Sequence, residues 1–421
     1  MTAAGLTGAD GFLARYVDVR DRLPGDLSVR DAAADAFRRA GLPGRRVEAW
    51  KYTDLRPLAS AAFHEPLNLP TDCAALLARV PRVDGARLVF VDGRFRGDLS
   101  TAPTAARFAL FATQADFGML ARPDREPMVA LNTMLAEDGA SIDVPENADA
   151  GLIHLISLAT DTPGGAADFH PRHRVRLAPG ATLTMLETSL GNGTYLHAPV
   201  TELHVAAGAT LTHIRHQDES TAAFHLSTLY AEIAENGTYD SFTLNLGARM
   251  ARNEVHARLA GSGATTHLNA AQLLSGNQHA DFTTVVRHDA PHGTSRQTVK
   301  NVLAGRSRGV FQGRIEVARH AQKTDGYQMS QSLLLSPDAE IDTKPELEIF
   351  ADDVKCSHGA TVGELDAEQL FYLRSRGIPD AEARSMLVRA FLAEALDAVS
   401  HDAARTVLES AVEGWWQRQA A

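Results

Sequence analysis

The segment Leu177-Ala-Pro-Gly-Ala-Thr-Leu-Thr-Met-Leu186 recurs 28 residues later as Val205-Ala-Ala-Gly-Ala-Thr-Leu-Thr-His-Ile214. A weaker copy follows at Gly263-Ala-Thr-Thr-His-Leu268. Each copy joins a glycine turn to residues that alternate between apolar and polar, which is the period of a β-strand. Repeats of about 20 to 50 residues are typical of solenoids, in which one turn of chain cannot bury its apolar side alone and stacks on the next. The repeat therefore predicts a β-helix-like stack, with a β-sandwich as the alternative.

The same pattern of short segments with alternating apolar and polar residues, interrupted by Gly, Asn and Asp, extends over residues 105–363. Within it an Asn-Gly-Thr-Tyr turn occurs twice, ending at Tyr195 and at Tyr239. We assign residues 105–363 to the β-helix core. Residues 1–104 are predicted to form an N-terminal, mostly helical domain, and residues 364–421 a C-terminal helical domain.

The N-terminal region begins with a helical pattern. An apolar stripe at helical spacing predicts a first helix and consists of Phe12, Leu13, Tyr16 and Val17. A second helix is predicted to start at Ser28-Val-Arg-Asp31 and to end at Gly41-Leu-Pro43, where a C-cap glycine precedes a proline. Further on, Arg87–Phe95 is predicted to be a short strand and turn. The aromatic residues Trp50 and Tyr52 are expected to pack against the neighbouring domain rather than to form a binding stripe.

The last 58 residues have the pattern of three helices. Asp366-Ala-Glu-Gln369 resembles a capping box and opens the first, which stops at Gly377-Ile-Pro379. The second starts near Asp380 and runs towards Ser400. The third carries an apolar stripe at helical spacing, formed by Ala404, Leu408, Ala411 and Trp415. Because three short helices make a poor core alone, we expect them to pack on the β-stack or to offer a face to a partner.

Composition narrows the class of protein. The chain has 421 residues, 44% of them hydrophobic, and a formal net charge of -11. This acidic balance argues against a nucleic-acid-binding surface, which normally has a basic stripe. Two cysteines cannot build a disulfide framework, which fits a reducing compartment. The first ten residues have no signal-peptide pattern, and no apolar run reaches the length of a membrane span. We therefore predict a cytoplasmic protein with no nucleic-acid or membrane partner.

Cys356 and His358 are the strongest candidates for metal chemistry. They lie two residues apart in a β-rich stretch, so both side chains should leave the same face of a strand. A thiolate beside an imidazole suits iron, zinc or an iron–sulfur cluster. Since Cys73 is far away in the sequence, a cluster held here would need ligands from another subunit. The alternative is a small buried cysteine beside a hydrogen-bonded histidine.

Other motifs give weaker signals. The histidines of the repeat region are interpreted as polar groups at strand edges and not as ligands; they include His170, His173, His197, His204 and His225. No Gly-rich phosphate-binding loop with Lys-Ser/Thr occurs, so the chain is not expected to bind ATP by that device. Acidic pairs at Asp352-Asp353 and at Glu346 and Glu348 would suit a carbohydrate-active β-helix enzyme. We interpret these acids instead as a solvated strand edge.

Several longer motifs carry a resemblance that covers most of the chain. They are Glu48-Ala-Trp-Lys-Tyr-Thr-Asp-Leu55, Gln278-x-x-Asp281, Val310-Phe-Gln-Gly-Arg-Ile-Glu-Val317, Ala321-Gln-Lys-Thr-Asp325, Leu333-Leu-Leu-Ser336, Lys344-Pro-Glu-Leu-Glu-Ile349, Ala351-Asp-Asp-Val-Lys-Cys-Ser-His-Gly-Ala-Thr-Val-Gly363 and Leu370-Phe-Tyr-Leu-Arg-Ser-Arg-Gly-Ile378. With these motifs the sequence resembles the SufB/SufD family of iron–sulfur cluster assembly scaffolds. The resemblance implies a right-handed parallel β-helix flanked by helical N- and C-terminal regions.

The resemblance also implies partners and roles. A SufD-like chain pairs with a SufB-like chain through the β-helix and carries a SufC-like ATPase on its C-terminal helices. A transient iron–sulfur cluster forms between the two β-helices, where His358 and Cys356 match the family's ligand positions. The residues that match the ATPase-binding helix are Gln369, Leu370, Phe371, Tyr372, Leu373, Ser375, Arg376 and Gly377. By this resemblance the chain is a non-catalytic scaffold, and the isolated chain is a possible homodimer.

The cysteine count assigns the branch of the family. SufB-like chains carry additional cysteines inside the β-helix, where sulfur is received and moved. Here no cysteine lies between Cys73 and Cys356, so no internal sulfur relay is available. We therefore interpret the chain as SufD-like, with a SufB-like paralogue, a carbohydrate-active enzyme and a purely structural brace as alternatives.

Overall fold

Two long sheets form the body of the molecule in the computed structural model, which describes residues 6–66, 72–161 and 165–420. Residues 1–5, part of the N-terminal stretch considered for a signal peptide, lie outside these ranges. The first sheet contains, in spatial order, β21(Glu340–Ile349), β19(Arg308–Val317), β17(His279–His288), β15(Met250–Leu259), β13(Phe224–Ile233), β11(Val200–Val205), β8(Arg172–Leu177), β5(Ala140–Val144) and β4(Arg107–Leu110). The short strands β1(Phe63–His64), β7(Ala166–Phe169) and β10(Tyr195–His197) attach to its side.

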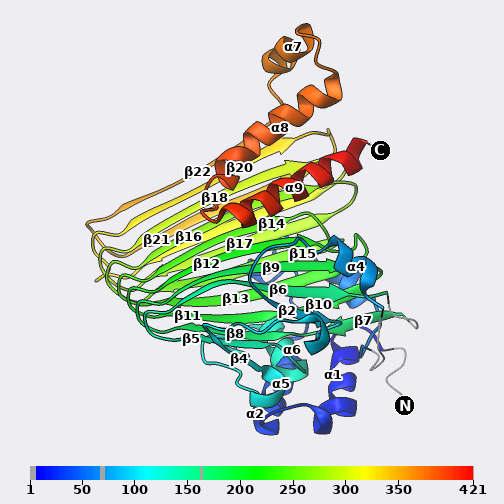
Figure 1. Ribbon diagram of the computed structural model, residues 1–421, viewed down its shortest axis with the longest axis vertical. Coiled ribbons are helices and arrows are strands. Elements are labelled where there is room, and N and C mark those ends of the chain that lie inside the picture. The colour runs from blue at the N-terminus through cyan, green and yellow to red at the C-terminus, as the bar shows by residue number, and fades with distance from the viewer. Residues whose placement is uncertain (1–5, 67–71, 162–164, 421) are drawn as a thin grey trace.

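The second sheet is formed by the strands that lie between these in sequence. Its order is β22(Lys355–Gly363), β20(Asp325–Leu334), β18(Thr294–Leu303), β16(Thr265–Leu274), β14(Thr238–Asn245), β12(Thr210–Asp218), β9(Thr182–Gly191), β6(Asp149–Ala159), β2(Ala86–Val91) and β3(Arg94–Phe95). From β11 to β22 successive strands alternate between the sheets, so each turn of chain in this part adds one strand to each sheet (Figure 1). The architecture is a β-solenoid, which confirms the predicted stack over the sandwich.

The sequence repeat encodes one corner of the solenoid. Thr210 pairs in register with Thr182, which is the offset of the two repeat copies. In the repeat, Gly180 and Gly208 turn the chain with φ of 68° and 65°, a left-handed conformation that glycine adopts without steric cost. The alanine after each glycine is fully buried. The repeat is therefore a turn followed by the first inward residue of a strand.

Apolar side chains from both sheets fill part of the space between them; among them are Leu155, Leu183, Leu211, Val255 and Phe282. A second apolar cluster joins the solenoid to N-terminal helices, above all α1(Gly8–Val19), α2(Leu27–Ala40) and α6(Pro127–Leu135). Smaller helical segments complete this region: α3(Arg56–Ala59), α4(Ala74–Arg79), α5(Phe111–Gln114) and the 3-10 turns η1(Arg20–Arg22), η2(Glu48–Trp50) and η3(Gly97–Leu99).

The predicted N-terminal elements are present, with two corrections. Val17, placed on the buried stripe of the first helix, is 64% exposed, because it lies beyond the edge of the stripe that Phe12 and Tyr16 bury. The second helix is capped by Asp26 rather than Ser28, since the Asp26 carboxylate accepts a hydrogen bond from the Ser28 backbone N–H. Trp50 is buried against the solenoid, as expected.

The three predicted C-terminal helices are α7(Ala367–Ser375), α8(Asp380–Leu396) and α9(Asp402–Ala420). α8 and α9 lie on the second sheet, where Trp415 and Leu408 pack with sheet residues such as Ile214 and Phe242. α7 projects away from the solenoid at the end where β22 lies (Figure 1). Across the residues described, none of the helices combines the length and apolar character needed to span a membrane.

Candidate functional site

Cys356 and His358 lie on β22, the strand that ends the second sheet. Their register partners on β20 are Gly326 and Gln328, and Gln328 is fully buried. Because residues i and i+2 of a strand share a face, both side chains are on the inward face of the last turn. No further turn of the described chain covers that face, so His358 is exposed.

Cys356 is half-buried beside an apolar cluster that includes Ile315 and Val317. Burial raises the pKa of the Cys356 thiol above its ordinary value. The free protein therefore holds a protonated thiol, and binding of a metal or cluster would release that proton. The two side chains offer one sulfur and one nitrogen donor, a set compatible with iron.

The last turn of the solenoid also has open strand edges. β21 pairs with β19 and β22 with β20, and in the described chain no strand pairs with their outer edges. Apolar residues beside these edges are exposed: Phe350 by 64%, Val362 by 56% and Ile349 by 37%. Unpaired backbone next to exposed apolar side chains is a surface suited to pairing with another chain.

The acidic residues considered for sugar chemistry do not converge on one another. Glu346 lies 3.2 Å from the Lys344 ammonium, and Asp353 pairs with Lys323. Glu348 is exposed and lies 3.9 Å from a guanidinium nitrogen of Arg314. These pairs fit the expected solvated strand edge.

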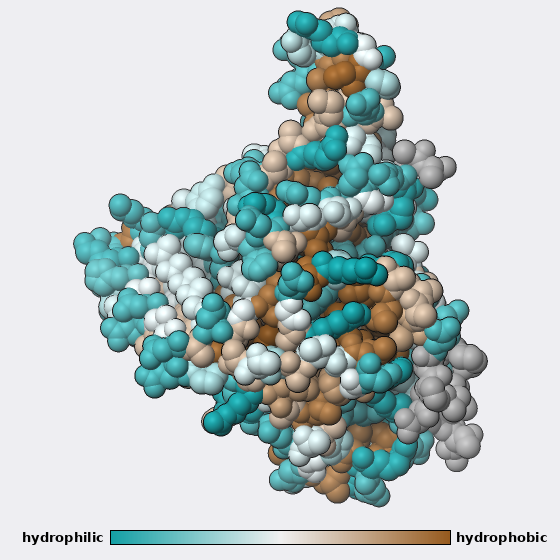
Figure 2. Space-filling view, in the orientation of Figure 1, coloured by the Kyte–Doolittle hydropathy of each residue, from teal (hydrophilic) through white to brown (hydrophobic). Residues whose placement is uncertain are grey.

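α7 carries the residues predicted to bind a partner. The Asp366 carboxylate accepts hydrogen bonds from the backbone N–H groups of Glu368 and Gln369 and so caps the helix, as the capping-box pattern predicts. None of the helix's residues is buried, and Phe371 and Tyr372 are 73% and 57% exposed. Hydrophobic surface is visible on this projecting part of the molecule (Figure 2).

Five of those predicted residues line an open groove with Leu387 of α8: Gln369, Phe371, Tyr372, Leu373 and Ser375. The Arg376 guanidinium lies over the Tyr372 ring, 5.1 Å from its centroid, and Gly377 ends the helix with a φ of 84°. Leu370 is half-buried. The contiguous apolar exposure is that of a helix without its packing partner.

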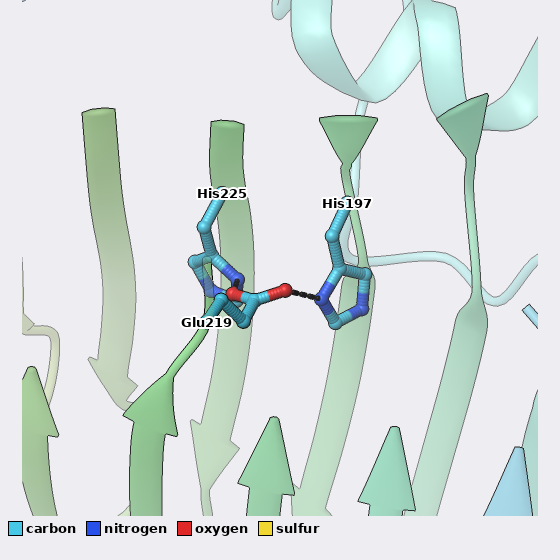
Figure 3. Close-up of side chains that lie close together, drawn as sticks. All are labelled: His197, Glu219 and His225. Atoms are coloured by element: carbon cyan, nitrogen blue, oxygen red, sulfur yellow. Dashed lines mark hydrogen bonds and ion pairs between the residues drawn. The ribbon is translucent and has the colours of Figure 1, made fainter. Parts of the chain in front are cut away.

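A second cluster of metal-binding side chains lies inside the solenoid, where we had expected only polar strand edges. His197 and Glu219 are joined by an Nδ1–Oε1 distance of 3.1 Å, and His225 and Glu219 by an Nδ1–Oε2 distance of 2.6 Å (Figure 3). All three residues are at least 95% buried. His197 and His225 were interpreted as polar groups at strand edges, and the structure places both in the buried interior instead.

Of the other three histidines predicted to lie at strand edges, two are buried and one is partly exposed. His170 and His173 are also buried, and His170 lies 2.7 Å from an oxygen of the buried Asp168. His204 is the exception, because its side chain is 31% exposed. The solenoid interior thus contains histidine side chains that were predicted from the sequence to lie at strand edges.

Comparisons with known proteins agree with this architecture. The family described as "SUF system FeS cluster assembly, SufBD core domain" matches residues 159–391, and the "SufBD protein N-terminal region" matches residues 27–151. The chain belongs to the SufBD family. Its SufBD core match covers the solenoid from β7 through β22 and reaches into α8.

Individual relatives indicate which branch of the SufBD family this chain resembles. The chain is 36% identical to the iron–sulfur cluster assembly protein SufD of Escherichia coli, over 86% of each chain. It is 32% identical to a SufBD family protein of Synechocystis, over 89% of this chain and 87% of the relative. A relative in Arabidopsis thaliana, named as chloroplastic, is 29% identical over 92% and 85%. The chain is thus a SufD-like iron–sulfur cluster assembly protein, while its predicted cytoplasmic location stays a prediction.

Proposed function

We propose that this chain is the SufD-like scaffold subunit of a SufBCD complex. It pairs with a SufB-like subunit, docks a SufC-like ATPase and contributes ligands to a nascent iron–sulfur cluster. The observation that supports this most directly is the last turn of the solenoid, where Cys356 and His358 lie beside two open strand edges. The chain itself is non-catalytic and binds no ATP, so ATP hydrolysis belongs to its partner.

Pairing with the SufB-like subunit follows from the open edges of β21 and β22. An antiparallel or parallel strand from another chain would satisfy their free N–H and C=O groups. It would also cover Val362 and Phe350, which are exposed in the single chain. The same edges would let an isolated chain pair with a second copy, so we expect a homodimer in the absence of SufB.

The cluster is cargo that the complex assembles and passes on. A two-iron cluster is normally held by four protein ligands, and one face of β22 offers two. The other ligands therefore come from the SufB-like partner across the junction. With this division neither chain would hold the cluster alone, and opening of the junction would release it.

The ligand role is tested with complexes isolated from cells without air. His358→Ala should lower the iron and sulfide per complex by about tenfold or more, while assembly of the three subunits and ATPase activity stay normal. Cys356→Ser should have a comparable or smaller effect. Ser357→Ala is the matched control, because Ser357 is exposed between them on the opposite face of β22. Normal iron and sulfide in the His358→Ala complex would show that His358 is no ligand.

ATPase docking is tested separately on α7. Phe371→Asp should abolish co-purification of the SufC-like ATPase, because it places a charge in the exposed apolar groove. Val17→Asp is the control, since Val17 is a comparably exposed apolar residue on a helix at the other end of the chain. Retained ATPase binding by Phe371→Asp would exclude α7 as the docking helix.

A further inference from the structure

The buried cluster of His197, Glu219 and His225 has the composition of a metal site. His197 ends β10, His225 lies near the start of β13, and Glu219 follows the end of β12. Figure 3 shows both imidazole rings turned towards the carboxylate between them. One ligand atom from each residue can be chosen so that all three lie within 4.8 Å of one another. Small rotations of the side chains would bring them to the roughly 3 Å spacing of ligands around one ion.

The hydrogen bonding of the cluster is incomplete. Nδ1 of His225 lies 2.6 Å from the carboxylate, yet it is not aligned for a hydrogen bond, and within the described parts of the chain Nε2 of His197 also has no hydrogen-bond partner. Buried polar atoms are nearly always paired, so such atoms call for an explanation. A close nitrogen–oxygen contact without hydrogen-bond alignment is what two ligands of a common ion would show.

Glu219 is the acidic member of the cluster, and its carboxylate is buried with 4% of the residue exposed. Among the described residues, the ion-pair partners of Glu219 are these two histidines, while the Gln217 side chain donates a neutral hydrogen bond at 2.9 Å. A buried carboxylate in this setting is stabilised by a cation.

The cluster borders a polar cavity that leaves room for further ligands. The cavity has a volume of about 30 Å³ and is lined by His197 and His225 together with other polar side chains. Such a volume holds about two water molecules. Because of this room, coordination positions that the three side chains leave unfilled would be open to water. Arg215 also lines the cavity, and its charge acts on Glu187, which lies 3.3 Å from His213.

We propose that His197, Glu219 and His225 bind a divalent first-row transition metal ion inside the solenoid, and that this ion is iron(II). Two imidazoles and one carboxylate with open positions form a donor set characteristic of iron(II) sites. The site contains no thiolate and lies on different strands from Cys356 and His358. It would bind a single ion apart from the cluster at the subunit junction.

The test uses the full chain with Cys356→Ala and His358→Ala, which removes the other candidate donors. After chelator treatment, Co²⁺ is titrated anaerobically and followed by its visible d–d absorption and by equilibrium dialysis. One Co²⁺ per chain should bind, with an affinity that falls by about 100-fold or more in Glu219→Gln. His154→Gln is the matched control, because His154 is an equally buried histidine that bonds to Thr188 instead.

Two further measurements keep the result decisive. If Glu219→Gln does not fold, His225→Gln takes its place, and the unfolding temperature of the parent chain should rise with Co²⁺. X-ray absorption of the parent chain loaded with Fe²⁺ should show nitrogen and oxygen neighbours and no sulfur. Absence of bound metal, or binding that survives both substitutions unchanged, would overturn the proposal. Neither outcome depends on cluster assembly, so failure of this metal-site proposal would leave the proposed scaffold function unaffected.

Discussion

The guanidinium of Arg252 stacks on the indole of Trp50, with 4.2 Å between its Cζ atom and the ring centroid. The same guanidinium pairs with the fully buried Asp281 on the adjacent strand. Thr53, three residues after Trp50, donates a hydrogen bond of 2.5 Å to Asp281. Two motifs far apart in sequence, residues 48–55 and 278–281, therefore meet around one buried arginine and fix the N-terminal region to the solenoid.

The first prediction concerns this junction. Asp281→Ala should lower the free energy of unfolding by about 3 to 5 kcal/mol, because it leaves Arg252 buried with one of its two acidic partners missing. Chemical denaturation monitored by circular dichroism measures the change. Glu232→Ala removes a partly exposed partner of the exposed Arg258 and should cost less than about 1 kcal/mol. Similar losses in the two variants would contradict a special role for the Arg252–Asp281 pair.

A second prediction compares two glycines at turns of the solenoid, one restricted by a close backbone contact and one only by its positive φ. A Cβ atom on Gly261 would lie 2.0 Å from the backbone nitrogen of Glu235, so Gly261→Ala forces the backbone apart and should cost roughly 3 kcal/mol or more. At Gly208 a Cβ atom meets nothing within 4 Å, and only the φ of 65° opposes alanine. Gly208→Ala should therefore cost about 1 to 2 kcal/mol. Thermal unfolding of both variants gives the order, and a reversed order would exclude this account of the corners.

The third prediction is a dependence of stability on pH. Burial lowers the pKa of His288 from 6.5 to about 4, and its Nε2 atom lies 2.9 Å from the Ser295 hydroxyl. Between these two values the unfolded chain binds a proton that the folded chain does not. Stability from this group is therefore complete above about pH 6.5 and falls by about 3 kcal/mol as the pH drops to 4.

His288→Gln removes this titration while keeping a polar group near Ser295. The variant should lose less stability than the parent chain between pH 7 and pH 5, as measured by urea unfolding at each pH. His320→Gln is the control, because His320 is exposed at the surface. Equal pH dependence in the parent chain and His288→Gln would show that His288 is not the titrating group.

The 28-residue sequence repeat also predicts which side chains of neighbouring turns lie next to each other. Its 28-residue offset equals the separation of His197 and His225, which are register partners on neighbouring strands. Applied to side chains, the period places these two histidines one above the other. Glu219 could not be found in this way, because it follows a strand of the opposite sheet, and only the folded chain brings it between them.

Helical stripes were less informative than the strand repeat. An apolar stripe reports that a helix has a face to bury but not what covers it. The stripe of α9 packs on the sheet through Leu408 and Trp415, whereas Phe371 of α7 is exposed. The sequence alone does not show which of these helices is covered, because that depends on the path of the chain after β22.

The last prediction follows from what α8 and α9 cover. Trp415 is 1% exposed and packs with apolar residues of the second sheet, so Trp415→Ala should cost about 3 to 5 kcal/mol. Trp416→Ala, at a half-buried neighbour, should cost about 1 kcal/mol. Urea unfolding distinguishes the two variants.

Removing residues 366–421 altogether should have a larger effect. It would expose the face of the second sheet that carries Ile214 and Phe242, and we expect the truncated chain to aggregate. Size-exclusion chromatography of the truncated chain beside Phe371→Asp measures this directly. A monodisperse truncated chain would show that α8 and α9 are dispensable for the solenoid. Aggregation of the truncated chain together with an intact Phe371→Asp variant would separate the structural role of α8 and α9 from the docking role proposed for α7.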